Sequence, residues 1–138
     1  MQVASPVERT LTVSDHSRLL RVLAQQAPGA AVHAMQDLLD ACDLLPAAAV
    51  PETLVTLGSR VLVQDPARDA PPYELTLCSP EDARPGDGCI SVLSPVGASL
   101  LGLHVGMSAR WRLPGGQEGS ARVLAVLSQP ESDKERAS

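Results

Sequence analysis

The hydrophobic period of this 138-residue chain changes just after residue 50. Ahead of this point apolar residues recur every three or four positions, as on one face of a helix. Beyond it they alternate with polar residues, as in half-buried strands. Helices followed by several short strands are typical of an α+β fold. We therefore predict a helical segment at residues 1–49, an antiparallel sheet domain with one short helix at residues 52–129, and a flexible tail at residues 130–138.

Two amphipathic helices are predicted in the first part. Ser14 or Asp15 is a suitable N-cap for the first helix, and Pro28-Gly29 ends it, because proline fixes φ and glycine tolerates positive φ. A short turn between two amphipathic segments predicts an antiparallel helical hairpin. Residues 11–13 alternate like a short extended segment, and residues 47–51 form a predicted linker. The expected apolar stripes are Leu19, Leu20, Leu23 and Ala27 on the first helix, and Val32, Met35, Leu38, Leu39, Cys42 and Leu45 on the second.

Strand-like alternation follows, most clearly at residues 73–78. Gly58-Ser59 predicts a bend between two strand pieces. Ser94-Pro95 predicts the start of a short helix that ends by Gly102, because serine caps a helix and proline fits its first position. The predicted strands are residues 55–57, 60–63, 73–78, 89–93, 107–113 and 121–127.

The composition argues against nucleic acid as the main partner. The formal net charge is −5, and the chain holds one Tyr, one Trp and no Phe. Proteins that bind single strands combine a basic groove with aromatic stacking platforms. Arg110, Arg112 and Arg122 could share a local basic patch, but no basic domain surrounds them. We therefore expect a protein partner and no direct recognition of nucleic acid.

No motif indicates a metal, a cofactor or catalysis. Cys42, Cys78 and Cys89 have no metal-binding or redox spacing, so they are predicted to be buried, reduced thiols. The glycine spacing from Gly97 to Gly102 is similar to a phosphate-binding loop, but that motif's Lys and Ser/Thr are missing. No apolar run reaches the ~20 residues that cross a bilayer, and the N-terminus lacks the features of a secretory signal. We expect a cytoplasmic protein that is not an enzyme.

Two sequence blocks carry a resemblance to a known family. They are Leu54–Val61 (LVTLGSRV) and Leu93–Gly116 (LSPVGASLLGLHVGMSARWRLPGG). In order and spacing they resemble the C-terminal domain of the bacterial transcript-cleavage factors GreA and GreB, over residues 52–129. The resemblance implies the FKBP-like fold of that domain. The FKBP-like fold does not by itself imply prolyl isomerase activity, because that chemistry uses an aromatic-lined pocket. Only Tyr73 and Trp111 are available here to line one.

The helical segment departs from the family pattern. In Gre factors a long coiled coil enters the secondary channel of RNA polymerase and places acidic residues beside the catalytic Mg²⁺, which takes oxygen ligands. Here the predicted tip, residues 25–31, reads QQAPGAA and carries no carboxylate. Helices of about 13 residues also extend only ~20 Å. From Thr10 to Gln129 the chain resembles the short-hairpin branch of the family, the regulators of nucleoside diphosphate kinase (Rnk).

This resemblance implies a non-catalytic regulator of transcription elongation. Such a protein would dock at the β′ rim of the polymerase secondary channel and compete with Gre factors without stimulating transcript cleavage. In the family this contact is made around the Ser-Pro pair, and Leu93 here precedes the pair where some Gre proteins carry an acid. Two alternatives stay open: Ser94-Pro95 only starts a helix, or the chain is an interaction module or oligomer unrelated to polymerase. The implied polymerase-binding residues are Ser94, Pro95 and Val96, with Ala98 and Leu101 on the helix behind.

Overall fold

The computed structural model describes residues 8–113 and 115–130. The predicted tail beyond Pro130 lies outside these residues. The helices are α1 (Val13–Ala24), α2 (Ala30–Ala41) and α3 (Pro95–Leu100), with short 3-10 turns at Ala47–Ala49, Pro80–Asp82 and Pro85–Asp87. The strands are β1 (Thr10–Thr12), β2 (Asp43–Leu45), β3 (Arg60–Gln64), β4 (Tyr73–Cys78), β5 (Cys89–Ser91), β6 (Ser108–Arg112) and β7 (Glu118–Ser128).

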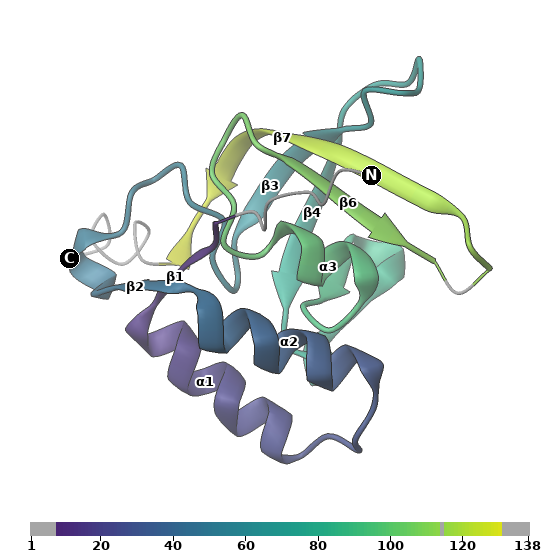
Figure 1. Cartoon of the computed structure of the whole chain (residues 1–138). Coiled ribbons are helices and arrows are strands. Elements are labelled where there is room, and N and C mark those ends of the chain that lie inside the picture. The colour runs from purple at the N-terminus through teal and green to yellow at the C-terminus, as the bar shows by residue number, and fades with distance from the viewer. Residues whose placement is uncertain (1–7, 114, 131–138) are drawn as a thin grey trace, which may run out of the picture.

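The main sheet has five strands in the order β5-β4-β3-β7-β6 (Figure 1). β3 pairs antiparallel with β4 and β7, and β6 pairs antiparallel with β7, but β5 runs parallel to β4. The predicted α+β class is therefore confirmed, and the predicted all-antiparallel sheet is wrong at β5. The loop between β4 and β5, with its two 3-10 turns, gives the chain room to cross back before β5 begins. The FKBP-like description stays a prediction.

The helical segment begins earlier than predicted. Thr12 is the N-cap of α1, because its hydroxyl accepts a hydrogen bond from the Asp15 backbone N–H at 3.0 Å. The predicted caps Ser14 and Asp15 lie inside the helix, as does Val13. Asp15 is directed into the protein, where its carboxylate binds the backbone N–H of Leu57.

The second helix ends earlier than its apolar stripe suggested. α2 stops at Ala41, and Leu45 belongs to the short strand β2, which pairs in parallel with β1. The backbone N–H of Asp43 donates to the carbonyl of Arg9 at 2.9 Å, so strand pairing replaces the next helical turn. The predicted linker at residues 47–51 contains the 3-10 turn Ala47–Ala49.

The sheet domain also differs from the predicted strands at its start. Residues 55–57 form no strand: Leu54 makes an isolated bridge to His104, and the chain then turns at Gly58, whose φ is +89°. The chain bends at Gly58-Ser59 as predicted, but only the residues after the bend form a strand. The strand at Tyr73–Cys78 has its predicted bounds.

The helices and the sheet share one continuous core. Figure 1 shows α1 and α2 side by side against the part of the molecule that carries α3. Leu20, expected in the apolar stripe of α1, is instead 49% exposed, because α1 turns Leu19 and Leu23 inward. The division into segments 1–49 and 52–129 stays a prediction, and the core crosses it. The buried cluster joins Leu11, Leu19, Leu23, Met35 and Leu39 to Val55, Leu57, Val61, Val63, Leu77, Val92, Leu100, Leu101, Leu103, Ala109, Ala121 and Val123.

Candidate interaction surface at helix α3

The start of α3 is held rigidly against the end of β5. The Ser94 hydroxyl accepts a hydrogen bond from the Gly97 N–H at 3.1 Å and donates one to the Ser91 carbonyl at 2.6 Å. Pro95 occupies the first helical turn, as predicted. A Cβ on Gly97 would collide with the Ser91 carbonyl oxygen, so glycine permits the close approach of α3 to β5. The capping interpretation of Ser94-Pro95 is therefore confirmed, and the same bonds fix a surface at this edge.

The structure brings four of the five predicted contact residues to this surface. Pro95 is exposed, and Ser94, Val96 and Ala98 are half-buried. Leu101 is 0% exposed and lies in the core, so its side chain is not presented to a partner.

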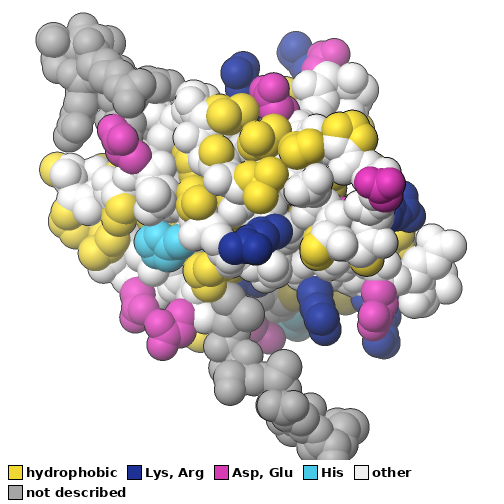
Figure 2. Space-filling view, turned by 90° about the horizontal axis from the view of Figure 1, so that it is seen from above, with side chains coloured by type: hydrophobic (Ala, Val, Ile, Leu, Met, Phe, Trp, Pro, Cys, Tyr) yellow, Lys and Arg dark blue, Asp and Glu magenta, His cyan; other side chains and the backbone are white. Residues whose placement is uncertain are grey.

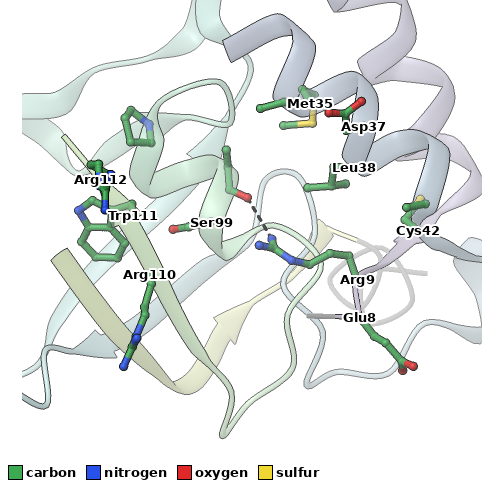
Figure 3. Close-up of a pocket in the computed structure, with 14 residues that line it drawn as sticks. Glu8, Arg9, Met35, Asp37, Leu38, Cys42, Ser99, Arg110, Trp111 and Arg112 are labelled. Carbon is green, nitrogen blue, oxygen red and sulfur yellow. Dashed lines mark hydrogen bonds between the residues drawn. The ribbon is translucent and has the colours of Figure 1, made fainter. Parts of the chain in front are cut away.

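A groove runs beside this surface, between α2, α3 and β6. Its volume is about 700 Å³, and Pro95 and Ala98 of the predicted contact set border it. From α2, Met35 and Leu38 project toward it, as Figure 3 shows. Both were expected in the apolar stripe of the second helix. Met35 is buried in the shared core, whereas Leu38 is half-buried and faces the groove.

Arg9 is a groove residue that the sequence did not single out. Its Nη1 donates to the Ala98 carbonyl at 3.0 Å and to the Leu101 carbonyl at 2.8 Å. These carbonyls lie at the C-terminal end of α3, where a cation is favoured. Burial lowers the pKa of the Arg9 guanidinium. No sequence signal marks this arginine, because its partners lie about ninety residues away.

The three predicted patch arginines share one face of β6 and β7, since Arg122 stands opposite Ser108, two residues before Arg110. The patch is partly neutralised, because Arg112 forms a 3.0 Å salt bridge with Glu118. Figure 2 shows acidic side chains next to basic ones on the face seen from above. The charge of this face is therefore mixed.

The turn between α1 and α2 is the tip at which the Gre resemblance implies acidic residues. Residues 25–29 connect the helices, and all five are exposed. Their side chains are those of two glutamines, an alanine, a proline and a glycine. Each helix has 12 residues, which corresponds to a length of about 18 Å.

The described residues offer little for metal or thiol chemistry. Within residues 8–113 and 115–130 no group of three or more His, Cys, Asp or Glu side chains could hold a metal ion. Cys42, Cys78 and Cys89 are free and half-buried, less buried than predicted. Burial raises the pKa of Cys42 and of Cys78, and for Cys78 the neighbouring Cys89 adds to the effect. These two thiols are therefore held in the protonated, less nucleophilic form.

A second hollow brings the two aromatic residues together. Tyr73 and Trp111 both border a hollow of about 840 Å³. The Trp111 ring lies over Gly119 on β7, at the place a Cβ would occupy. Tyr73 lies on β4 and Trp111 on β6, with β3 and β7 between them in the sheet, so the hollow joins side chains from separate strands.

A comparison with protein families shows the family to which this chain belongs. Residues 50–128, more than half of the chain, match the model of the family described as "Transcription elongation factor, GreA/GreB, C-term". The chain belongs to the GreA/GreB family. The match spans the Ser94-Pro95 helix start and all five strands of the main sheet.

The chain also resembles two relatives over about two thirds of its length. It is 37% identical over 94 residues to the "Regulator of nucleoside diphosphate kinase" of Escherichia coli K12, which covers 68% of this chain and 68% of the relative. The protein of the same name from Shigella flexneri has the same identity and coverage. These relatives are named regulators, in agreement with a non-catalytic role.

A solved structure of a GreA/GreB protein has the same fold. The "Prokaryotic transcription elongation factor GreA/GreB from Nitrosomonas europaea" superposes with a TM-score of 0.73 at 27% sequence identity, covering 88% of this chain and 99% of that chain. The GreA/GreB architecture therefore extends over both the helical segment and the sheet. In the described part of the chain, no helix is long and apolar enough to cross a membrane.

Proposed function

We propose that this protein is a non-catalytic regulator that binds RNA polymerase at the β′ rim of the secondary channel. It competes there with Gre factors and does not stimulate transcript cleavage. The observation that carries the proposal is the pairing of a GreA/GreB C-terminal domain, whose Pro95 stands exposed on a rigid helix start, with a helical tip that lacks carboxylates.

The docking part of the proposal rests on the α3 edge. Ser94 is engaged in its own hydrogen bonds, so it shapes the edge, while Pro95 and the accessible parts of Val96 and Ala98 provide an apolar contact. Leu93 is half-buried just before the pair. A few well-packed residues near the centre of an interface carry most of its binding energy, and we propose that Pro95 is one of them.

The absence of cleavage rests on the tip. Stimulated cleavage needs carboxylate oxygens at the catalytic Mg²⁺. Residues 25–29 supply none, and helices of about 18 Å reach no further than the mouth of a channel that a long coiled coil enters. Occupation of that mouth would exclude a Gre factor by steric overlap.

Backtracked elongation complexes test both parts. Incubation with this protein alone should leave the RNA length unchanged beyond the intrinsic rate. Added together with GreB, the protein should lower GreB-stimulated cleavage as its concentration rises. Transcripts that shorten faster with this protein alone would contradict the proposal, and so would a failure to bind core polymerase in a pull-down.

The name of the relatives refers to nucleoside diphosphate kinase. We infer that such a link is indirect and acts through transcription, because the chain carries no kinase-like motif. An interaction module or oligomer unrelated to polymerase is the alternative. The 49% exposed Leu20 and the 50% exposed Val13 on α1 favour it, because they offer apolar surface for a second copy. Sedimentation of the purified protein separates a self-associating chain from a monomer.

A further inference from the structure

The groove between α2, α3 and β6 continues directly from the proposed docking edge. Pro95 and Ala98 stand on its α3 side, and Leu38 and Ala41 stand on its α2 side. A partner seated on Pro95 would therefore also meet α2. The partly exposed apolar side chains on both walls are suited to apolar side chains of that partner.

The Arg9 guanidinium lies at one end of this groove with unused hydrogen-bonding capacity. An arginine has five N–H donors, and the bonds of Arg9 to Ala98 and Leu101 both use Nη1. The ion pairs among the described residues join Arg60 to Glu74, Arg68 to Asp65 and Arg112 to Glu118, and none of them includes Arg9.

The acidic side chains at the groove do not neutralise this cation. Glu8 and Asp37 border the groove, but Figure 3 shows both carboxylates turned away from the Arg9 guanidinium. Among residues 8–113 and 115–130, Arg9 has no ion-pair partner and only its Nη1 donates hydrogen bonds. A half-buried cation in that situation is costly, and a partner's carboxylate that reaches Nε and Nη2 would offset the cost with charge-assisted hydrogen bonds.

We propose that this groove is part of the polymerase-binding surface, and that it receives a segment carrying apolar side chains and one carboxylate, which pairs with Arg9. The inference rests on the proposed function and adds to it a named contact between α2 and the polymerase. The binding surface therefore extends from the α3 edge onto the helical segment. It includes one short-range ionic contact at Arg9, in a groove that Arg110 and Arg112 also border.

A pair of alanines on α2 provides a matched test. Ala41 is exposed and borders the groove near Arg9, since the Asp43 N–H binds the Arg9 carbonyl at 2.9 Å. Ala31 is exposed on the same helix but does not border the groove. Ala41→Glu adds a carboxylate to the groove that Arg9 borders, where it would repel the partner's carboxylate or compete with it for Arg9, whereas Ala31→Glu adds the same charge outside the groove.

The full-length variants are compared in binding to core RNA polymerase by biolayer interferometry. We expect Ala41→Glu to raise the Kd by about tenfold or more and Ala31→Glu to change it by less than about twofold. Arg9→Gln keeps a donor for the α3 carbonyls, removes the charge, and should weaken binding as Ala41→Glu does. Circular dichroism must show that each variant is folded.

The outcomes separate this inference from the proposed function. If the unchanged protein binds polymerase and Ala41→Glu binds equally well, the groove inference is wrong and the docking proposal stands. If the unchanged protein does not bind polymerase, both fail. If Ala41→Glu changes the sedimentation of the protein alone and leaves its polymerase affinity intact, the groove receives a second copy of this chain, and the inference is again overturned.

Discussion

The Oδ2 atom of Asp15 accepts a hydrogen bond of 3.0 Å from the backbone N–H of Leu57, 42 residues further along the chain. Both residues are almost wholly buried, with exposed fractions of 6% and 4%. The bond joins the first turn of α1 to the turn that precedes β3. A buried N–H needs a partner, so this carboxylate fastens the helical segment to the sheet.

Replacement of Asp15 by alanine should therefore lower the free energy of unfolding by about 2 kcal/mol, because it leaves the Leu57 N–H buried and unsatisfied. Asp15→Asn keeps an acceptor oxygen and should cost less. Urea unfolding followed by circular dichroism measures both effects. Asp40→Ala, an exposed acid on α2, is the control and should stay within about 0.5 kcal/mol. Equal losses at Asp15 and Asp40 would show that the bond contributes little.

Gly97 should tolerate no side chain. Its Cβ would meet the Ser91 carbonyl, so Gly97→Ala must separate α3 from β5 and should cost about 2 kcal/mol or more. Gly86 has open space around its Cβ position, and Gly86→Ala should be close to neutral. Thermal unfolding of the two variants makes the comparison, and a Gly97→Ala protein as stable as the unchanged chain would contradict the rigid attachment of α3.

Pro95 is expected to contact the polymerase. Pro95→Asp suits the first turn of a helix but places a charge in an apolar contact, so it should weaken binding to core polymerase about tenfold, or ~1.4 kcal/mol. Pro85 is an exposed proline at the start of another helical turn, and Pro85→Asp serves as the matched control. If a folded Pro95→Asp protein binds normally, the polymerase contact lies on another surface.

We expect competition with GreB to depend on the volume of the tip between α1 and α2 and not on which side chains the tip carries. Replacing Gln25 and Gln26 with alanines should leave competition with GreB intact. Replacing them with Asp and Glu should still give no stimulated cleavage, because helices of about 18 Å hold the new carboxylates away from the catalytic Mg²⁺. Cleavage gained by the acidic variant would show that the tip reaches the catalytic centre.

We expect the ionisation of Cys78 to lower the free energy of unfolding at alkaline pH. Its pKa is raised by burial and then by Cys89, so on raising the pH the unfolded chain loses this proton first. The unfolded state then binds fewer protons, and stability should fall as the pH rises above about 8.5. Urea unfolding between about pH 7.5 and 9.5 measures the slope, which Cys78→Ala should reduce. Iodoacetamide should also label Cys78 in the folded protein more slowly than free cysteine at pH 8.

Features with short-range causes were predicted correctly from the sequence. The Tyr73–Cys78 strand follows from alternation, and the start of α3 follows from a serine cap before a proline. Each signal lies within a few residues of the structure it determines, so no knowledge of the rest of the chain is needed.

Features that depend on distant partners were missed. Asp15 was predicted as a possible cap, but it binds Leu57 instead. Leu45 continues the helical stripe of α2, yet pairing with β1 places it in a strand. At the site, Leu101 fits the family pattern but is buried, and Arg9 faces the groove only because α3 lies beside it. Periodicity identifies an apolar residue without telling which element will cover it.

The parallel pairing of β1 with β2 places Thr10 opposite Asp43 and Thr12 opposite Leu45, so the strands that precede α1 and follow α2 are joined in one two-stranded ribbon. Whole turns could therefore be added between Ala24 and Ala30 without moving either attachment. Under the proposed function, the length of the helical arm would set how deeply it enters the channel, separately from the docking of the sheet domain. A long arm that ends in acids and a short arm that ends in glutamines would then differ in length and tip sequence while they share the same attachment to the sheet domain.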